Sequence, residues 1–271
     1  MAGYKRNPRK NNDEVKEQKR LMQEMVEKEQ DIIWHEEETL KKFLLFAASF
    51  HHYSYNNQLL IYAKFPNATM VQTYGGWIKK GRKVIPAENK NYIELFAPVP
   101  KQTWVTKEIK NENGDIELDE DGNRKTKKEC IHYMDYRVVY VYDASQTEGK
   151  RIPELSGEAE DPLYETREDL FHALSPLCNQ VLESMSPYDM LRCVSQEFLK
   201  QQYGICVLHE AEACSFVLSA YLQLGSQDCD TATVFEWAKD RDRKEIAGSM
   251  DHVLKACKKI IDALEVSVCS Q

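Results

Sequence analysis

Aromatic, amide and basic side chains lie close together between residues 53 and 84, interspersed with glycines. Single-stranded nucleic acid offers base faces, on which aromatic rings stack, and phosphates, which lysine, arginine, amide side chains and backbone N–H groups hold. Glycines, as at positions 75, 76 and 81, let the backbone approach a phosphate more closely than a side chain would allow. The residues predicted to form such a binding site are Tyr53, Ser54, Tyr55, Asn56, Asn57, Lys64, Thr69, Tyr74, Trp77, Lys79, Lys80, Arg82 and Lys83.

A purely structural interpretation of the same segment stays open at this point. Tyr53, Tyr55 and Trp77 fit equally well as core aromatics, and the neighbouring lysines fit a solvated turn. The residue types alone do not decide between binding and packing.

The distribution of charge favours binding, although the net charge of −8 at first argues against a nucleic-acid partner. Residues 40–100 hold eight basic side chains and only two acidic ones, Glu88 and Glu94, a local balance of +6. The acidic surplus lies in residues 115–121 and 154–169. A basic stretch that is also rich in aromatic residues is the pattern expected of a nucleic-acid surface.

Several motifs in this stretch resemble the N-terminal domain of ArdC-type antirestriction proteins, which also occurs in LtrC-like proteins and TraC-type primases. The motifs are Tyr53-Ser54-x-Asn56-x-x-Leu59-Leu60-Ile61, Pro66-x-Ala68-Thr69, Trp77-x-x-x-Gly81-Arg82-x-Val84, Ile93-x-Leu95-x-Ala97-Pro98 and the closing Tyr142-Asp143-x-Ser145-Gln146-Thr147. The resemblance covers about residues 40–153. It implies single-stranded-DNA binding and a role on plasmids or conjugative elements, such as antirestriction or protection of transferred DNA.

The family usually carries a C-terminal zinc-metallopeptidase-like domain, whose HExxH helix supplies two ligands one turn apart and a general base. Here His209-Glu210 is followed by Ala211-Glu212-Ala213, so no second histidine stands four residues on. Residues 210–217 resemble the acidic-ligand helix of that domain. We therefore expect a degenerate domain without catalysis and without a cofactor; the remaining weak metal candidates are His209, Glu210 and Glu212.

Two other functions remain as alternatives. One is a zinc-dependent metallopeptidase with unorthodox ligands. The other is a non-enzymatic interaction module, in which the C-terminal helices bind DNA-transfer, replication or restriction proteins.

The helices and strands predicted around these residues indicate an α+β fold. We expect N-terminal helices packed on a small antiparallel sheet with a long β-hairpin, followed by an all-helical C-terminal part. The predicted organisation is a disordered basic tail over residues 1–12, the DNA-binding domain over 13–153, an acidic linker over 154–166 and the helical domain over 167–271.

Hydrophobic periodicity and turn residues predict the individual elements. Residues 13–50 are helical, with a break near 29–31, and Ser54 begins a helix over 55–64 that Pro66 ends. The predicted strands are 69–74, bounded by Gly75-Gly76, then 84–85, 92–98, 103–109 and 131–142. The last two form an extended hairpin whose residues 119–123 resemble part of a calcium loop, read here as a solvated tip. The C-terminal helices are 168–185, 187–203, 206–224, 231–239 and 244–266.

The chain has neither a signal peptide at its start nor an apolar run of about 18–20 residues, which indicates a cytoplasmic protein without a membrane partner. The eight cysteines form no CxxC pair, which argues against a zinc finger or a disulfide framework.

Overall fold

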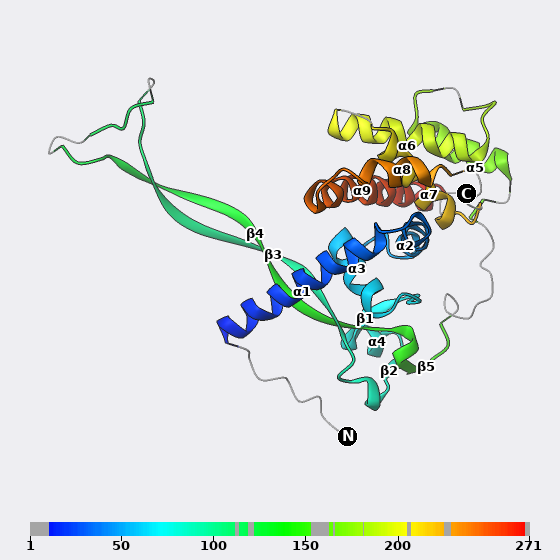
Figure 1. The fold of residues 1–271 in the computed structure, drawn as a ribbon, viewed down its shortest axis with the longest axis horizontal. Helices are drawn as coiled ribbons and strands as arrows, with labels where there is room; N and C mark the ends of the chain where they lie inside the picture. Colours follow the sequence, from blue (N-terminus) through cyan, green and yellow to red (C-terminus); the bar gives the residue numbers. More distant parts are fainter. Residues whose placement is uncertain are drawn as a thin grey trace. The chain divides into compact units, whose positions relative to one another are not determined.

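The computed structural model describes residues 11–111, 114–118, 122–152, 163–164, 166–180, 182–204, 207–224 and 229–268 (Figure 1). Nearly all of the predicted tail, most of the predicted acidic linker and the core of the calcium-like segment lie outside these residues. The described chain forms two compact units. The first comprises the residues up to Glu94 and from Tyr140 onward, and the second is Leu95–Val139.

Three N-terminal helices begin the first unit: α1 (Asn12–Ile33), α2 (Glu37–Ser49) and α3 (Tyr55–Lys64). A capping box starts α1, in which Asn11 and Glu14 each accept a hydrogen bond of 2.8 Å from the other's backbone N–H. The predicted break near residues 29–31 is wrong, because α1 continues to Ile33. Gln30 is a buried polar residue that interrupts the apolar pattern, but its amide donates to the carbonyl of Arg243 at 2.9 Å, so the helix does not need to end there. The bounds predicted for α3 are confirmed.

The first unit also holds a short strand, β1 (Val71–Thr73), which pairs antiparallel with the end of β4 (Thr126–Asp143), with Val71 opposite Asp143. A separate pair joins β2 (Arg82–Val84) to β5 (Thr147–Gly149). Short 3₁₀ turns lie at Pro86–Glu88 and Ala144–Gln146.

The glycine pair at 75 and 76 lies in a helix, α4 (Tyr74–Lys79), and does not form the strand-bounding turn that the sequence predicts. The helix begins here because Thr73 caps it: its hydroxyl accepts the N–H of Gly76 at 3.1 Å. The cap thus outweighs the low helix propensity of two glycines.

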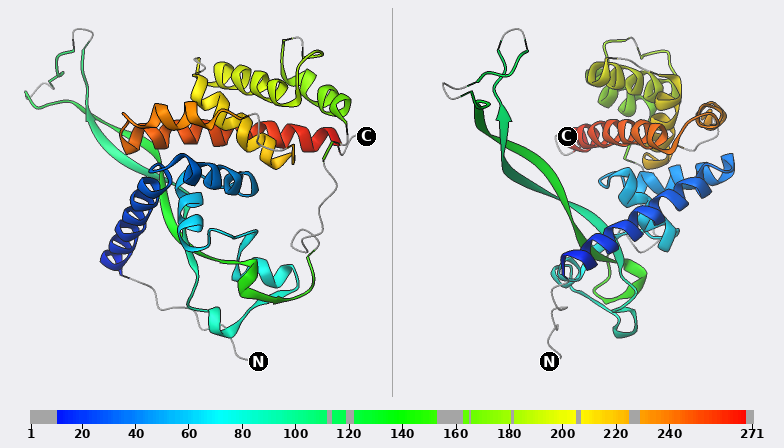
Figure 2. Two further views of the ribbon diagram at one scale, coloured as in Figure 1. Left: turned by 45° about the vertical axis from the view of Figure 1, so that its right-hand side comes forward. Right: turned by 60° about the vertical axis from the view of Figure 1, so that its left-hand side comes forward.

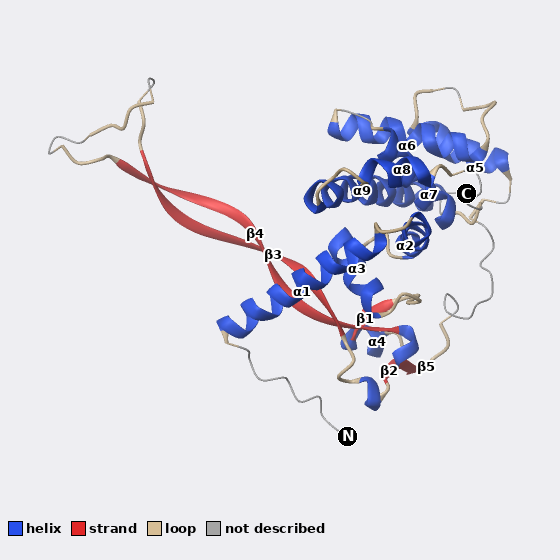
Figure 3. Cartoon of the chain, in the orientation of Figure 1, coloured by secondary structure: helices blue, strands red, loops and turns tan. Residues whose placement is uncertain are grey.

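A long hairpin, formed by β3 (Ile93–Glu108) and β4, is the main feature of the second unit (Figure 3, red). The two strands predicted at 92–98 and 103–109 are one continuous strand. The sheet order β1-β4-β3 makes β3 an edge strand, which is where proline is tolerated, so Pro98 and Pro100 do not end it. The predicted hairpin is confirmed.

The C-terminal part is helical, as predicted, and its helices lie side by side (Figure 2, yellow-green to red). They are α5 (Arg167–Leu174), α6 (Pro187–Tyr203), α7 (Leu208–Tyr221), α8 (Thr231–Ala238) and α9 (Arg243–Val268). The first is shorter than predicted because a 3₁₀ turn with Pro176 follows it, and proline cannot continue an α-helix. Helices α2, α6, α8 and α9 all pack against α7, whose residues from His209 to Ser219 are all buried. The six described cysteines are free thiols.

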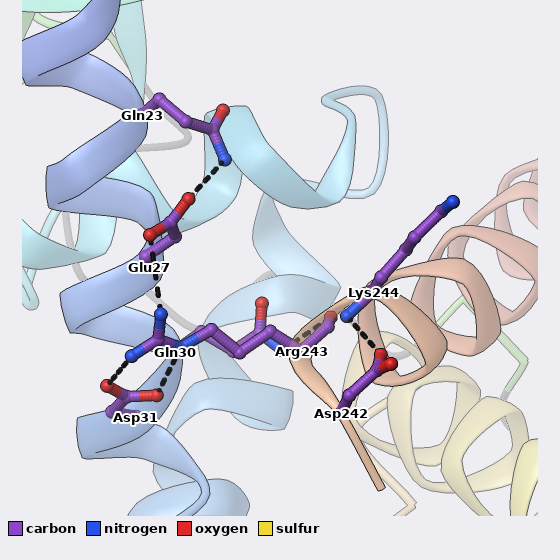
Figure 4. A network of polar contacts seen from close by, with 7 residues as sticks. All are labelled: Gln23, Glu27, Gln30, Asp31, Asp242, Arg243 and Lys244. Carbon is purple, nitrogen blue, oxygen red and sulfur yellow. Dashed lines mark hydrogen bonds and ion pairs between the residues drawn. The ribbon is translucent and has the colours of Figure 1, made fainter.

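A polar network joins the first helix to the last (Figure 4). The guanidinium of Arg243 contacts both carboxylate oxygens of Asp31, at 2.8 and 2.6 Å, and Glu27 at 3.3 Å. Gln30 donates to the Arg243 carbonyl from the same face of α1. Contacts of this kind, together with the packing of α2 on α7, place the N-terminal and C-terminal helices in one compact unit and confirm the α+β class. Within the described residues, no helix combines the length and apolarity that a membrane span requires.

Candidate nucleic-acid interface

Three of the sequence motifs meet around one cavity of about 350 Å³ in the first unit. Asn67 and Thr69 come from the turn after α3, Arg82 comes from β2, and Asp143 and Ser145 come from the end of β4 and the 3₁₀ turn after it. The remaining lining residues are Ala144, Arg151 and Ile152. The motifs are far apart in the sequence, so their meeting is a property of the fold. The cavity combines guanidinium, amide and hydroxyl groups, which suit a phosphate or the polar edge of a base.

Asp143 holds two sides of this cavity together. Its Oδ1 accepts the backbone N–H of Thr69 at 3.2 Å, and its Oδ2 accepts both the N–H and the hydroxyl of Ser145, at 2.9 and 2.5 Å. Its own N–H donates to the Gln146 side chain at 2.9 Å, and that side chain donates in turn to the carbonyl of Asn91 at 2.7 Å. The Asp-x-Ser-Gln motif is therefore a structural connector that fixes the cavity wall.

Arg82 is anchored by its own strand pair. Its Nε and terminal nitrogens donate to the hydroxyl and carbonyl of Thr147, at 2.8 and 2.7 Å, and to the carbonyl of Lys150 at 2.8 Å. All three acceptors are neutral, so the guanidinium charge is not cancelled by these contacts. Because a guanidinium has five N–H donors, it keeps donor capacity toward the cavity.

Trp77 belongs to the buried core that packs against two of the lining residues, Ala144 and Ile152. Its side chain is fully buried, and its Nε1 donates to the carbonyl of Tyr142 at 2.9 Å. It packs with Val84 and Ile152, and the Arg82 guanidinium lies 6.0 Å from its ring centroid. The ring has no exposed face in this structure, so stacking of Trp77 on a base does not fit its place in the core.

The pairing of β2 with β5 creates a cluster of cations that the sequence analysis did not identify. Arg82 lies opposite Gly149, and the N–H of Lys150 donates to the carbonyl of Gly81 at 3.1 Å. This brings the residues after β5 next to those around β2. We call the resulting cluster the basic edge; its members are Lys79, Lys80, Arg82, Lys83, Lys150 and Arg151.

The basic edge is open to solvent. All of its members are exposed except Arg82, which is half-buried. Its four lysines form no ion pair with any residue that the structure describes. One acid, Glu148, lies opposite Lys83 in the strand register, and the four lysines outnumber it.

Gly149 makes this strand pair possible. Its φ of +132° is strained for any other residue, and an added Cβ would lie 2.6 Å from the carbonyl oxygen of Gly81 and 3.0 Å from the Cα of Arg82. The close approach of the two strands, and with it the joining of Lys150 to the edge, therefore depends on glycine at this position.

Of the other predicted site residues, four lie on α3 and four outside it, and apart from Thr69 they do not line the cavity. Tyr55 is fully buried, and its hydroxyl accepts from Trp34 at 2.9 Å, so its predicted stacking on bases does not fit the structure either. Tyr53 is half-buried and donates to the Val71 carbonyl at 3.3 Å; burial raises its pKa. Ser54 is exposed, Asn56 and Tyr74 are half-buried, and Asn57 is buried. Lys64 is exposed and donates to the Tyr92 carbonyl.

Comparison with known proteins agrees with this arrangement of motifs. Residues 14–142 match the family model for the N-terminal domain of the anti-restriction factor ArdC. This segment is an ArdC-type N-terminal domain. Among solved structures, this chain is similar to the metal-free crystal structure of the antirestriction ArdC protein from the R388 plasmid. The two are 16% identical with a TM-score of 0.35, over 79% of this chain and 85% of that one. No curated protein matches the sequence significantly.

The match to the ArdC-type domain ends at Tyr142, one residue before Asp143, so the cavity includes residues beyond it. Ser145, Lys150, Arg151 and Asn67 were not among the predicted site residues. Asn67 and Ser145 stand within motifs and could have been found from that signal. Lys150 and Arg151 carried no signal, because only the strand pair brings them to the edge.

The weak metal candidates on α7 each bind a different partner. His209 Nε2 lies 3.1 Å from the hydroxyl of Ser249, and its ring stacks on Trp237 at 3.7 Å between centroids. Burial, assisted by the charge of Arg241, lowers the pKa of His209 to about 4. Its ring is therefore neutral at pH 7.

The two acidic metal candidates on α7, Glu210 and Glu212, contact other residues than His209 does. Glu210 lies 3.1 Å from Nδ1 of His252, and Glu212 accepts from the Tyr188 hydroxyl and pairs with Nε of Arg192 at 2.8 Å. Among the described residues, no three His, Cys, Asp or Glu side chains converge as a metal site would require.

Proposed function

We propose that this chain binds single-stranded DNA through the basic edge and the cavity beside it, and that it does so without catalysis. The observation that carries the proposal is the β2–β5 pair, which joins Lys150 and Arg151 to the lysines at 79, 80 and 83. Phosphates bind such a cluster with release of counterions, whatever the sequence of bases.

The cavity supports a single strand over a duplex. Asn67, Thr69 and Ser145 offer amide and hydroxyl groups at its wall, next to the cations. An unpaired base can turn its polar edge into a pocket, whereas a paired base must first leave the stack. The family of the matched model is named for an anti-restriction factor, so protection of DNA against restriction on a plasmid or conjugative element is the biological role we propose.

The absence of catalysis is proposed from the sequence and from the geometry of α7. The sequence lacks the second histidine of an HExxH motif. His209, Glu210 and Glu212 are each engaged by a different neighbour, which leaves no converging ligand set among them.

Fluorescence anisotropy with a labelled thymidine oligonucleotide tests this proposal on the full chain. We expect micromolar or tighter binding that weakens steeply between about 50 and 200 mM salt. A triple variant, Lys79→Ala with Lys80→Ala and Lys83→Ala, should bind at least about tenfold more weakly and lower the salt slope by about 2, because each single-strand phosphate contact contributes about 0.7.

The matched control changes three exposed lysines at α8 and α9: Lys239→Ala with Lys244→Ala and Lys255→Ala. It alters net charge by the same amount, so it should leave the salt slope unchanged if binding is local to the basic edge. Equal loss in the two triple variants, or no salt-sensitive binding by the native chain, would refute the proposed interface.

A further inference from the structure

The hairpin of the second unit has two chemically different faces. The side chains of Lys101 and Asp135 are paired across the strands, and Lys107 Nζ lies 2.9 Å from Glu129. On the other side, the rings of Phe96 and Tyr136 lie 6.3 Å apart between centroids. Side chains alternate along a strand, so the odd-numbered residues of both strands share the face with these two ion pairs, and the even-numbered ones share the opposite face, which also carries Glu108, the partner of Arg124, at the end of β3.

The even-numbered face is aromatic and exposed. Trp104 is 67% exposed, Met134 53% and Tyr136 48%. His132 is exposed as well, and Phe96 is half-buried. We call these five residues the aromatic face. Large exposed rings gathered on one face of a β-ribbon are unusual for a surface that serves only solvation.

The hairpin stem, which comprises residues 95–109 and 124–139, carries a positive net charge that would attract a polyanion. It holds seven basic and three acidic side chains, a balance of +4 in a chain with a net charge of −8. All three acids are already neutralised within the stem, since Asp135 pairs with Lys101, Glu129 with Lys107 and Glu108 with Arg124.

Three cations of the stem remain available. Lys127, Lys128 and Arg137 form no ion pair with any residue in the described part of the chain. Lys128, an even-numbered residue, lies on the same face as Trp104. A face that combines flat rings with an unneutralised cation fits stacked bases and their phosphates.

We propose that the aromatic face is a second binding surface, a platform on which unpaired bases of single-stranded DNA stack while Lys128 contacts a phosphate. It shares its ligand with the proposed function and rests on it, but it uses different residues. Bases in a duplex stack on one another and present only their edges, so the platform selects a single strand.

Two tyrosines on β4 provide a matched test. Tyr136 is on the aromatic face and Tyr133 is on the opposite one, with exposed fractions of 48% and 46%. In the full chain, Trp104→Ala with Tyr136→Ala should weaken binding of a labelled thymidine oligonucleotide by at least about tenfold, since one stacked base is worth about 1–3 kcal/mol. Tyr133→Ala should change the affinity less than twofold.

A second readout separates stacking from charge. The aromatic variant should keep the native salt slope, because ring stacking releases no counterions. Of the four tryptophans only Trp104 is exposed, so oligonucleotide binding should quench tryptophan fluorescence in the native chain and not in Trp104→Phe. Trp104→Phe should retain most of the affinity, because phenylalanine also stacks.

The outcomes distinguish this surface from the basic edge. Equal effects of Tyr133→Ala and Tyr136→Ala, or undiminished binding by the aromatic variant, overturn the platform and leave the basic edge standing. A loss that appears with duplex DNA to the same extent also overturns it. If the aromatic variant is impaired and the triple lysine variant is not, the platform stands and the basic edge fails.

Discussion

The basic edge and helix α7 hold their polar groups in opposite ways. The lysines of the basic edge are exposed and have no acidic partner among the described residues. On α7, His209, Glu210 and Glu212 are buried, and each is held by a neighbouring helix. Unpaired surface cations retain their attraction for a ligand, whereas buried groups with partners have already used theirs.

The contrast indicates which of the two regions can bind a ligand. Both regions carry residue types that suit a site, and the sequence alone gave reasons to consider each of them. Of the two, the basic edge holds exposed lysines that form no ion pair with a described residue. The polar groups of α7 instead specify how α6, α8 and α9 pack around it.

The largest expected effect concerns Trp77, which the structure places under the basic edge as core. Trp77→Ala should lower the free energy of unfolding by about 3–5 kcal/mol, because it removes a fully buried ring and leaves a cavity. Chemical denaturation measures this. The matched control is Trp104→Ala, at a 67% exposed position, which should change stability by no more than about 0.5 kcal/mol. If Trp77→Ala lowered the free energy of unfolding as little as Trp104→Ala, Trp77 would not be a core residue and would be restored as a stacking residue.

A smaller loss of stability is expected from the protonation of His209. Its folded pKa of about 4 lies below the ordinary value of 6.5, because burial disfavours the charged ring. Below about pH 6.5 the unfolded chain takes up this proton and the folded chain does not, so stability falls as the pH drops toward 4. The loss should be about 2–3 kcal/mol over that range.

The variant His209→Gln isolates this contribution from those of other groups. Its stability should fall less than that of the native chain between pH 6.5 and 4, as measured by urea denaturation at each pH. Parallel curves for the two proteins would show that His209 is not held neutral, and the contrast between α7 and the basic edge would weaken.

The smallest of the three effects is expected from Glu212→Ala. It leaves the hydroxyl of the half-buried Tyr188 and the Arg192 guanidinium without their shared partner, which should lower stability by about 2 kcal/mol, a moderate value because Arg192 is 39% exposed. Affinity for single-stranded DNA should not change. Metal analysis of protein purified without added zinc gives the sharpest check: a stoichiometric metal that disappears in Glu212→Ala would restore the metallopeptidase alternative.

Much of the fold could be predicted from the sequence, because its strongest signals are local. The bounds of α3 and α6 could be predicted from a serine at each N-cap position, of which only Ser186 accepts a capping hydrogen bond, and from Pro66 beyond the first helix and Gly204 after the second. The errors arose where a distant contact or an adjacent cap outweighed the local pattern. Gln30 continues α1 because it reaches Arg243, and Thr73 starts α4 despite two glycines.

The candidate site was predicted only in part. Lys79, Lys80, Arg82 and Lys83 are at the basic edge as expected, because a run of adjacent charges stays together in any fold. The aromatic residues were harder to assign. A tyrosine or tryptophan serves equally well as core or as a stacking surface, and burial distinguishes the two. Tyr55 and Trp77 are core, while Trp104 is exposed on the hairpin.

The ArdC-type motifs, the basic stretch over residues 40–100 and the absence of an HExxH motif can all be read from the amino-acid sequence, since each is a matter of residue type and spacing along the chain. The meeting of three motifs at one cavity, and the addition of Lys150 and Arg151 to the basic edge, can be seen only in the folded chain. Both depend on the β1–β4 and β2–β5 pairs, which join segments far apart in the chain. Such pairing depends on the whole set of contacts, and no short window of sequence contains it.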